Sequence, residues 1–292
     1  MSWHGSSDRN YAANYFNDMT VTLNLQRIIS SLETLRSLSS ISPPQVTASD
    51  IQILETVSST NQTLWELLQT DITSTPVVIA TQQTAGRGQW GRQWQSTRGG
   101  LYLSMGMNFN SVNILPPQLT MATAWGIATQ LQEYNIPVQL KWPNDLILKG
   151  RKLGGILTET KMSQQQISQA VIGVGINWNN PVPETGINLQ QYLAKSTEPV
   201  KVQSLELLAA LVISGIELGL KLCLQGKIEY LLKNYLRLLN SLGRQVKIDG
   251  NSGVVVGVTF TGELRVQLGS IPPSATSREV CIKPGTISLG YD

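Results

Sequence analysis

Histidine and cysteine are scarce in this sequence of 292 residues. The one histidine, His4, lies near the start, which excludes Ser-His-Asp catalysis, Cys-His catalysis and histidine-rich metal sites. The two cysteines, Cys223 and Cys281, cannot build a disulfide framework and lack metal-ligand spacing. No basic segment followed by an apolar one opens the sequence, so we expect no secretory signal and a reducing, cytoplasmic location.

Long apolar runs are also missing. The most apolar long run, Leu207 to Ile216, lies between two glutamates and is too short to cross a bilayer, so no membrane partner is expected. A content of 41% apolar and 14% charged residues is typical of a folded protein and excludes a disordered chain. The length predicts one large domain or two unequal ones.

Acidic residues and lysine are absent from the whole stretch between Ile72 and Gln132, which contains three arginines, Arg87, Arg92 and Arg98. The net charge of the chain is +3, so acidic and basic residues are equally numerous outside this stretch and the whole positive excess lies within it. Concentrated positive charge indicates an anionic ligand there, although a solvated loop would have the same composition. The absence of a basic tail argues against bulk nucleic-acid binding.

Hydrophobic periodicity predicts three parts. Residues 1–50 are expected to form a tail, one helix over Leu23–Leu38 and a linker rich in serine and proline, with a net charge of −1. Residues 51–240 contain both helical and strand periodicity. Three of their predicted strands follow one another without helices between them, which favours a mixed, mainly antiparallel sheet in an α+β fold. Residues 241–292 carry short strands split by Gly, Asn and Pro, which predicts a small β-barrel. In the middle part, strands are predicted at 51–57, 77–81, 101–107, 138–148, 155–159 and 170–176. Helices are predicted at 60–68, 117–134 and 204–239, the last with a break near Gln225–Gly226.

The densest motif lies at residues 86–94, Gly-Arg-Gly-Gln-Trp-Gly-Arg-Gln-Trp. Its glycines satisfy the G-x-G-x-x-G spacing, but a dinucleotide fingerprint opens a helix and is followed by an acid about twenty residues later. Here a predicted strand at 101–107 follows, and the next acid is Glu133. The motif therefore indicates a flexible loop whose N–H groups and guanidiniums suit phosphate or carboxylate oxygens. A surface loop with arginines stacked on the indoles remains the alternative.

Four further blocks carry polar or basic residues beside turns and strand ends, at 59–61, 141–145, 151–157 and 173–179. Taken singly, each has a structural interpretation, such as a capped turn, a solvated hairpin tip or the end of a buried strand. In this order the blocks and the loop resemble the biotin–protein ligase family, over about residues 51–289. The matching segments are Ser-Thr-Asn at 59–61, Gly-Arg-Gly-x-x-Gly-Arg-x-Trp at 86–94, Gly-Leu-Tyr at 100–102, Lys-Trp-Pro-Asn-Asp at 141–145, Lys-x-Gly-Gly-Ile-Leu at 152–157 and Gly-x-Gly-x-Asn-x-Asn at 173–179.

The resemblance implies a fold and an activity. The fold would be a class II synthetase-like catalytic domain at 51–240 with an SH3-like domain at 241–292, in a form without a DNA-binding N-terminal domain. Such ligases convert biotin and ATP, with Mg²⁺, into biotinyl-5′-AMP and pass biotin to one lysine of a carrier. The implied partner is the biotin carboxyl carrier protein of acetyl-CoA carboxylase. A homodimer is left open, DNA is not expected, and metal ligands are not identified.

The resemblance also assigns site residues. Arg87 and Lys152 would stabilise charge on the transferring phosphate, and Asp145 would orient Lys152 or assist the incoming amine. The implied biotin-binding residues are Ser59, Thr60, Asn61, Gln82, Gly86, Arg87, Gly88, Gln89, Trp94, Lys152 and Gly154. The implied ATP-binding residues are Arg87, Trp90, Arg92, Trp94, Lys141, Asn144, Lys152, Asn177 and Asn179.

One departure and three alternatives accompany this interpretation. Many relatives carry arginine where this chain has Gln89, and an amide offers only uncharged bonds to a phosphate region. A lipoate–protein ligase would be expected to have an Arg-Arg-x-x-Gly-Gly-Gly type of loop and a His-Asp pair. A biotin-sensing repressor would need a basic N-terminal helix-turn-helix, and residues 1–50 predict one helix and a net charge of −1. A dinucleotide-binding oxidoreductase lacks the helix and acid described above.

Overall fold

The structure is a computed structural model, and it describes residues 23–37, 46–70, 75–109, 112–197, 199, 201–269 and 278–291. The predicted tail at 1–20 and most of the predicted linker lie outside the described residues. The domain boundaries at 50/51 and 240/241 stay predictions.

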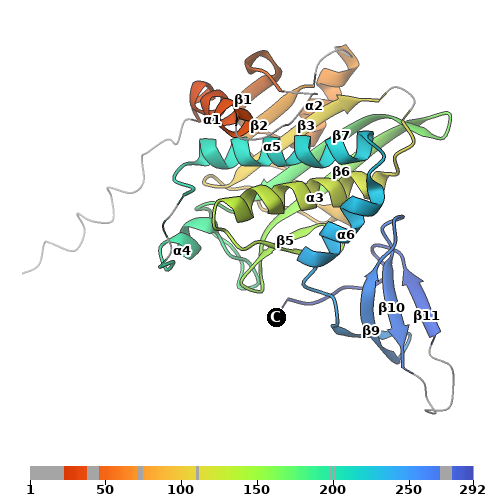
Figure 1. Ribbon diagram of the computed structural model, residues 1–292. Helices are drawn as coiled ribbons and strands as arrows, with labels where there is room; N and C mark the ends of the chain where they lie inside the picture. The colour runs from red at the N-terminus through yellow and green to blue at the C-terminus, as the bar shows by residue number, and fades with distance from the viewer. Residues whose placement is uncertain are drawn as a thin grey trace, which may run out of the picture.

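A seven-stranded sheet forms the body of the protein, in the order β1-β2-β3-β7-β6-β5-β4 (Figure 1). Strands β1 and β2 pair in parallel, and the other neighbouring strands pair in antiparallel fashion, so the prediction of a mixed, mainly antiparallel sheet is confirmed. The strands are β1 Ile51–Val57, β2 Val77–Gln83, β3 Leu101–Asn108, β4 Gln139–Lys141, β5 Asp145–Leu148, β6 Arg151–Ser163 and β7 Gln166–Ile176.

The predicted strand at 138–148 is two strands, because the turn at Trp142–Asn144 interrupts it. Strands β6 and β7 are also longer than predicted. Toward the turn that joins the two strands their residues are half-buried or exposed, apart from the buried Ile167, so the apolar signal in the sequence covers only the remaining part of each strand.

Helices cover both faces of the sheet. Helix α2, Thr60–Thr70, closes a small apolar cluster on one face, made of Leu64, Leu68, Val78 and Val171. On the other face lie α3, Pro116–Glu133, and α5, Leu205–Leu224, which run across the sheet over the main core (Figure 1). A Cβ at Gly126 would lie 2.0 Å from the carbonyl oxygen of Gly215, so the backbones of α3 and α5 pack in direct contact.

Helix α5 is longer than the apolar run Leu207 to Ile216 that it contains. By length and composition it could cross a membrane, but 78% of its most apolar window is buried inside the protein, as expected for a core helix. Ser204 caps its start by accepting a bond from the N–H of Leu207. The predicted break is confirmed, since Gly226 adopts a φ of +67° before α6 begins, Ile228–Leu238.

The predicted N-terminal helix is also confirmed, as α1, Leu25–Ser37, and it packs on α5. Glu217 of α5 is buried and accepts bonds from the Arg36 guanidinium and, at 2.8 Å, from the N–H of Val46. Burial raises the pKa of Glu217, and the Arg36 bond opposes that shift. This cluster fixes α1 and the residues leading into β1 on the core.

A second, four-stranded antiparallel sheet follows α6, in the order β11-β10-β9-β8, as expected for an SH3-like domain (Figure 1). Its strands are β8 Gln245–Ile248, β9 Asn251–Val258, β10 Leu264–Leu268 and β11 Arg278–Ile282. The indole N–H of Trp142 donates to the carbonyl of Gly262, at 2.9 Å, and ties the small sheet to the body. Three short helical segments were not predicted: η1 Ala48–Asp50, η2 Gln89–Gly91 and α4 Leu189–Leu193.

Candidate active site

One pocket gathers the sequence motifs that lie far apart along the chain. Its wall is formed by the start of α2, the end of β2, the loop at residues 86–94 (the Gly-Arg loop), the Trp142–Asn144 turn with its flanking strand ends, and facing parts of β6 and β7. A segment that follows β11, at Ile287–Tyr291, completes the wall. This last segment was not predicted to take part.

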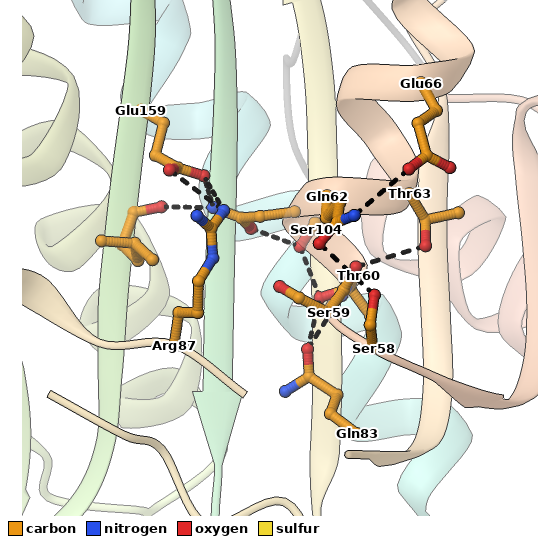
Figure 2. Close-up of polar contacts among 12 residues, drawn as sticks. Ser58, Ser59, Thr60, Gln62, Thr63, Glu66, Gln83, Arg87, Ser104 and Glu159 are labelled. Atoms are coloured by element: carbon orange, nitrogen blue, oxygen red, sulfur yellow. Dashed lines mark hydrogen bonds and ion pairs between the residues drawn. The ribbon is translucent and has the colours of Figure 1, made fainter. Parts of the chain in front are cut away.

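At one end of the pocket, neutral polar side chains form a continuous hydrogen-bonded network (Figure 2). Gln83 accepts at Oε1 from the N–H of Thr60, at 2.9 Å. The Ser104 hydroxyl lies 2.7 Å from Thr60 Oγ1 and 2.6 Å from Asn61 Oδ1. Ser59, immediately before α2, and Thr60 and Asn61, in its first turn, are all buried. These groups are therefore held in fixed positions before any ligand arrives.

The structure places one predicted residue outside the pocket wall and brings two unpredicted residues, Gln83 and Ser104, into the network. Gln82 does not line the pocket, and its neighbour Gln83 does. Adjacent residues of a strand point to opposite faces, so only one of the two can face the site. Ser104 was missed; it is a fully buried polar residue within the apolar strand Leu101–Met107, and that isolation was the available signal.

The predicted cation Arg87 is paired with an acid that was not predicted. Its Nη2 lies 2.9 and 3.1 Å from the two carboxylate oxygens of Glu159, as Figure 2 shows. Asn61 Nδ2 donates to the same carboxylate at 2.8 Å. The Arg87 side chain is 46% exposed, so an anionic ligand could draw it away from Glu159 at little cost.

The Gly-Arg loop is folded on itself. The N–H of Gly88 donates to the carbonyl of Arg92 at 2.7 Å, and Trp90 has a φ of +54°. Arg92 lies 5.7 Å from the centroid of the Trp90 ring, so the alternative of an arginine stacked on an indole is realised for this pair. Trp90 is half exposed and packs against Gly285 of the segment after β11.

Two polar atoms of this loop are buried without a hydrogen-bond partner among the described residues: Gln89 Oε1 and Trp94 Nε1. Both residues line the pocket. The Trp94 indole packs on the backbone of Gly175, where a Cβ would lie 2.4 Å from Nε1. Buried polar atoms without partners are uncommon, and in a pocket wall they indicate groups that a ligand satisfies.

At the other end of the pocket, charged side chains pair with one another. Lys152 Nζ lies 2.6 Å from Asp145 Oδ1, and the Tyr291 hydroxyl donates to Asp145 Oδ2. Lys141 Nζ lies 3.3 Å from the centroid of the Tyr291 ring. Burial lowers the pKa of Lys141 to about 8, and the nearby Asp145 carboxylate opposes that shift. Burial raises the pKa of Tyr291, so its hydroxyl stays protonated and donates.

Several predicted residues support the pocket without lining it. Asn177 Nδ2 donates to the carbonyl of Lys152 at 3.4 Å, and Asn179 is exposed. Gly86 is buried beneath the loop, where a Cβ would lie 2.5 Å from the carbonyl oxygen of Trp94. Gly154 packs against the backbone of β7, and Gly155 lines the pocket instead.

The remaining predicted residues are brought together in the wall: Ser59, Thr60, Asn61, Arg87, Gly88, Gln89, Trp90, Arg92, Trp94, Lys141, Asn144, Asp145 and Lys152.

No group of three or more His, Cys, Asp or Glu side chains that could hold a metal occurs in the part of the chain that the structure describes. Among the residues that line the pocket, the one carboxylate is Asp145. A metal here would therefore have to arrive with most of its ligands already bound.

Comparisons with known proteins match the part of the chain that contains the sequence motifs of the pocket. The family model of the biotin/lipoate A/B protein ligase family matches residues 53–177. The bifunctional ligase/repressor BirA of Bacillus subtilis is 35% identical over 127 residues, which are 43% of this chain and only 39% of that protein. Its Escherichia coli counterpart is 30% identical over 217 residues, 74% of this chain and 67% of that protein. Among solved structures, the biotin protein ligase from Aquifex aeolicus in complex with biotin and ATP superimposes with a TM-score of 0.63 at 25% identity, covering 79% of this chain and 95% of that one.

Proposed function

The chain belongs to the biotin–protein ligase family, and from that premise we propose that it activates biotin with ATP and transfers it to a carrier protein. The observation that carries the proposal is the division of one pocket into a neutral end and a cationic end. Biotin has the same division, with an uncharged ureido ring at one end and a carboxylate at the other. The first product would be biotinyl-5′-AMP, and the second a biotinylated lysine.

The neutral end suits the ureido ring. The ring offers two N–H donors and one carbonyl acceptor, and a neutral group of this kind is recognised by hydrogen bonds rather than by charge. Thr60, Asn61 and Gln83 would supply the donors and acceptors, and the buried Ser104 hydroxyl behind them holds Thr60 and Asn61 in place. Biotin would therefore bind without reorganising these side chains, which lowers the cost of binding.

The cationic end suits the reaction centre. The biotin carboxylate attacks the α-phosphorus of ATP, the α–β phosphoanhydride bond breaks, and pyrophosphate leaves with the bonding electrons. Lys152 and Lys141 lie at this end, and Arg87 can reach it by leaving Glu159. Their charges would keep the two anions from repelling each other and would stabilise the negative charge on the transferring phosphate.

Transfer then needs no nucleophile from the protein. The amine of the carrier lysine attacks the acyl carbon of biotinyl-5′-AMP, AMP leaves, and an amide forms. This agrees with the single histidine of the sequence. It also agrees with Cys223, a buried thiol whose pKa is raised by burial to about 12 and which is therefore inert.

Magnesium would enter this site bound to ATP. Mg²⁺ keeps several waters and usually takes one or two carboxylates in addition to substrate phosphates. The pocket offers one carboxylate, Asp145, whose two oxygens are already bound to Lys152 and Tyr291, so the phosphates and waters would supply the ligands of the ion. When bound, the ion supplies charge neutralisation on the phosphates.

The Gly-Arg loop would cover the adenylate. Biotinyl-5′-AMP is a mixed anhydride that water hydrolyses, so it must be shielded until the carrier lysine arrives. The unpaired atoms Trp94 Nε1 and Gln89 Oε1 would find their partners on the ligand as the loop closes.

The finer assignments belong to the same proposal. The carrier would be the biotin carboxyl carrier protein of acetyl-CoA carboxylase, and the reaction would take place in the cytoplasm. No DNA partner is proposed, because the described residues before β1 provide one α-helix that packs on the core. A homodimer stays open to measurement.

The direct test is incubation of the full chain with biotin, MgATP and a lysine-bearing biotin carrier domain, followed by intact-mass measurement of the carrier. We expect one biotinyl group per carrier, dependent on ATP and on the target lysine. A parallel reaction with lipoate and a lipoyl carrier tests the other ligand in the family's description. Modification by lipoate and none by biotin would refute the proposal.

A further inference from the structure

We propose that Tyr291 is a positioning residue for the adenylation step, because its hydroxyl bond to Asp145 fixes the carboxylate that holds Lys152. The inference rests on the proposed function for its chemistry. It concerns a residue that none of the sequence motifs contains, about 150 positions from the Lys-Trp-Pro-Asn-Asp block.

Tyr291 lies in a segment that is fixed in place. Leu289 is buried, and the carbonyl of Gly290 accepts a bond from Arg244 Nη1 at 3.0 Å. Farther back, Gly285 packs against the Trp90 ring of the Gly-Arg loop. These contacts hold the segment after β11 against the body of the protein, and from there the Tyr291 phenol reaches the pocket.

Both oxygens of Asp145 are engaged. Oδ1 is bound to Lys152 Nζ at 2.6 Å, and Oδ2 accepts from Tyr291. The last torsion of an aspartate side chain is broad and nearly two-fold, so a carboxylate with one partner can swing. A donor on the second oxygen removes that freedom. The position of the Lys152 ammonium therefore depends on Tyr291 through Asp145.

The charges around Asp145 make this dependence matter. Lys141 is electrostatically coupled to Asp145 and to Lys152. Without the Tyr291 hydroxyl, the second oxygen of Asp145 would attract the Lys141 ammonium. Lys141 and Lys152 would then both point at Asp145 instead of at a phosphate. The neutral hydroxyl satisfies the second oxygen without consuming a cation.

The ring and the hydroxyl of Tyr291 have separable contacts. The ring lies 3.3 Å from Lys141 Nζ, and the hydroxyl binds Asp145. Phenylalanine keeps the ring and loses the hydroxyl, while alanine loses both. Tyr291→Phe therefore tests the bond to Asp145 alone, and Tyr291→Ala adds the loss of the contact with Lys141.

The rival interpretation is that the segment blocks the nucleotide end and that ATP displaces it. The two interpretations predict opposite results. If Tyr291 positions Lys152, removing its hydroxyl slows adenylation; if it blocks the site, removing it lowers the KM for ATP or speeds adenylation.

The experiment is single-turnover formation of biotinyl-5′-AMP by the full chain, for wild type, Tyr291→Phe, Asp145→Asn and the double variant. We expect Tyr291→Phe to slow the adenylation rate constant about tenfold, as is typical for loss of a bond to a charged group, with the KM for biotin unchanged. In the Asp145→Asn background the same change should have no further effect. Tyr230→Phe, at a half-exposed tyrosine of α6, is the matched control and should behave as wild type. An unchanged rate, a lower KM for ATP, or a full tenfold loss in the Asp145→Asn background would each overturn the proposal.

A second measurement separates this inference from the proposed function. Acetic anhydride labelling of the folded protein, read by peptide mass spectrometry, reports how tightly Lys152 is held and needs no turnover. We expect Lys152 to be labelled several-fold faster in Tyr291→Phe than in wild type, and Lys161 to be labelled equally in both. Equal labelling of Lys152 would overturn the inference even if the ligase is active. Inactive wild type with faster labelling in the variant would instead refute the function and leave the positioning contact standing.

Discussion

The neutral end and the charged end of the pocket are built from different parts of the protein. Thr60, Gln83 and Ser104 come from the first turn of a helix and from adjacent strands of the large sheet, and they bond to one another through neutral groups. The charged end combines strand ends with a loop and with the segment that carries Tyr291. One end is held by regular structure, and the other is assembled from separate segments.

Under the proposed function, this difference follows from what each end would bind. A neutral ring with fixed donors and acceptors is best met by groups that are already aligned, since each misplaced hydrogen bond loses its stabilisation. Polyphosphate is flexible and strongly charged, and the cations that meet it need a partner while the site is empty. Glu159 serves Arg87 in this way, and Asp145 serves Lys152. The comparison predicts that substitutions at the neutral end affect biotin affinity, and those at the charged end affect the chemical step or ATP.

Replacement of Lys152 should have the largest effect. Lys152→Ala removes a cation from the transferring phosphate, and loss of one such transition-state donor costs about 3–4 kcal/mol, so adenylation should slow by about 10²- to 10³-fold. Stopped-time measurement of biotinyl-5′-AMP gives the rate. Lys161→Ala removes a lysine from the same strand outside the pocket and should leave the rate unchanged. Unaltered adenylation in Lys152→Ala would show that this ammonium only caps a hairpin.

Gly173→Ala should disturb the neutral end selectively. A Cβ at Gly173 would lie 2.2 Å from Asn61 Oδ1, so the amide must leave Ser104 and Glu159. The displaced amide would no longer meet biotin, and loss of one or two hydrogen bonds to the ligand at about 1 kcal/mol each should raise the KM for biotin about five- to thirtyfold. Steady-state kinetics with each substrate varied in turn provide the measurement.

The KM for ATP should stay near its wild-type value in that variant. Gly257→Ala, where a Cβ would meet no atom closer than 3.5 Å, is the control for adding a methyl group to a strand. Equal loss of affinity for both substrates would mean that the two ends are not independent.

Lys141 should give the charged end a pH dependence that the neutral end lacks. Its pKa is lowered to about 8, so the amine carries its charge below that pH and loses it as the pH rises through 8. The free enzyme's pKa appears in kcat/KM, so kcat/KM for ATP should fall about tenfold by pH 9 if the charge binds phosphate. Lys141→Arg retains the charge and should shift the decline beyond that range. A wild-type profile that stays flat to pH 9.5 would remove Lys141 from phosphate binding.

Gln89→Arg should produce the smallest effect. Gln89 Oε1 is buried and without a partner in the described residues, so the amide points inward but offers no charge. A charge-assisted bond in place of a neutral one is worth about 1 kcal/mol, and the residence time of biotinyl-5′-AMP should lengthen roughly fivefold. A biotin chase measures it, with Gln95→Arg as a control that adds the same charge at an exposed position directly after the loop and outside the pocket. Equal off-rates would mean that position 89 does not retain the intermediate.

The resemblance to the ligase family, carried by the order of the motifs, was enough to predict the blocks that form the pocket. Their convergence became visible only in the structure, where most of them lie at strand ends of one sheet. The sequence did not show which of Gln82 and Gln83 faces the pocket. The four residues before Thr81 are apolar and fully buried on both faces, so no alternation marks which side faces the ligand. The structure resolves this by bonding Gln83 to Thr60.

Contacts between distant segments were beyond the reach of local patterns. Neither the pairing of Arg87 with Glu159 nor that of Asp145 with Tyr291 has a signature in spacing, since the partners belong to different elements. Helix α1 illustrates the same limit, because its periodicity predicted a helix but gave no sign that Arg36 would meet the buried Glu217. Ser104 was the exception that a lone polar residue in an apolar strand could have revealed.

The bond from Trp142 to Gly262 has a consequence for local unfolding. Proteins open in sub-global units at free energies below that of complete unfolding. An opening that separated the small sheet from the body would break this bond and withdraw Tyr291, while Thr60 and Ser104 stayed within the large sheet. The apparent affinity for ATP would then be scaled by the fraction of molecules that are closed, whereas that for biotin would not. Hydrogen exchange at the Trp142 indole N–H therefore measures the fraction of open molecules, and with it the loss of apparent ATP affinity that opening causes.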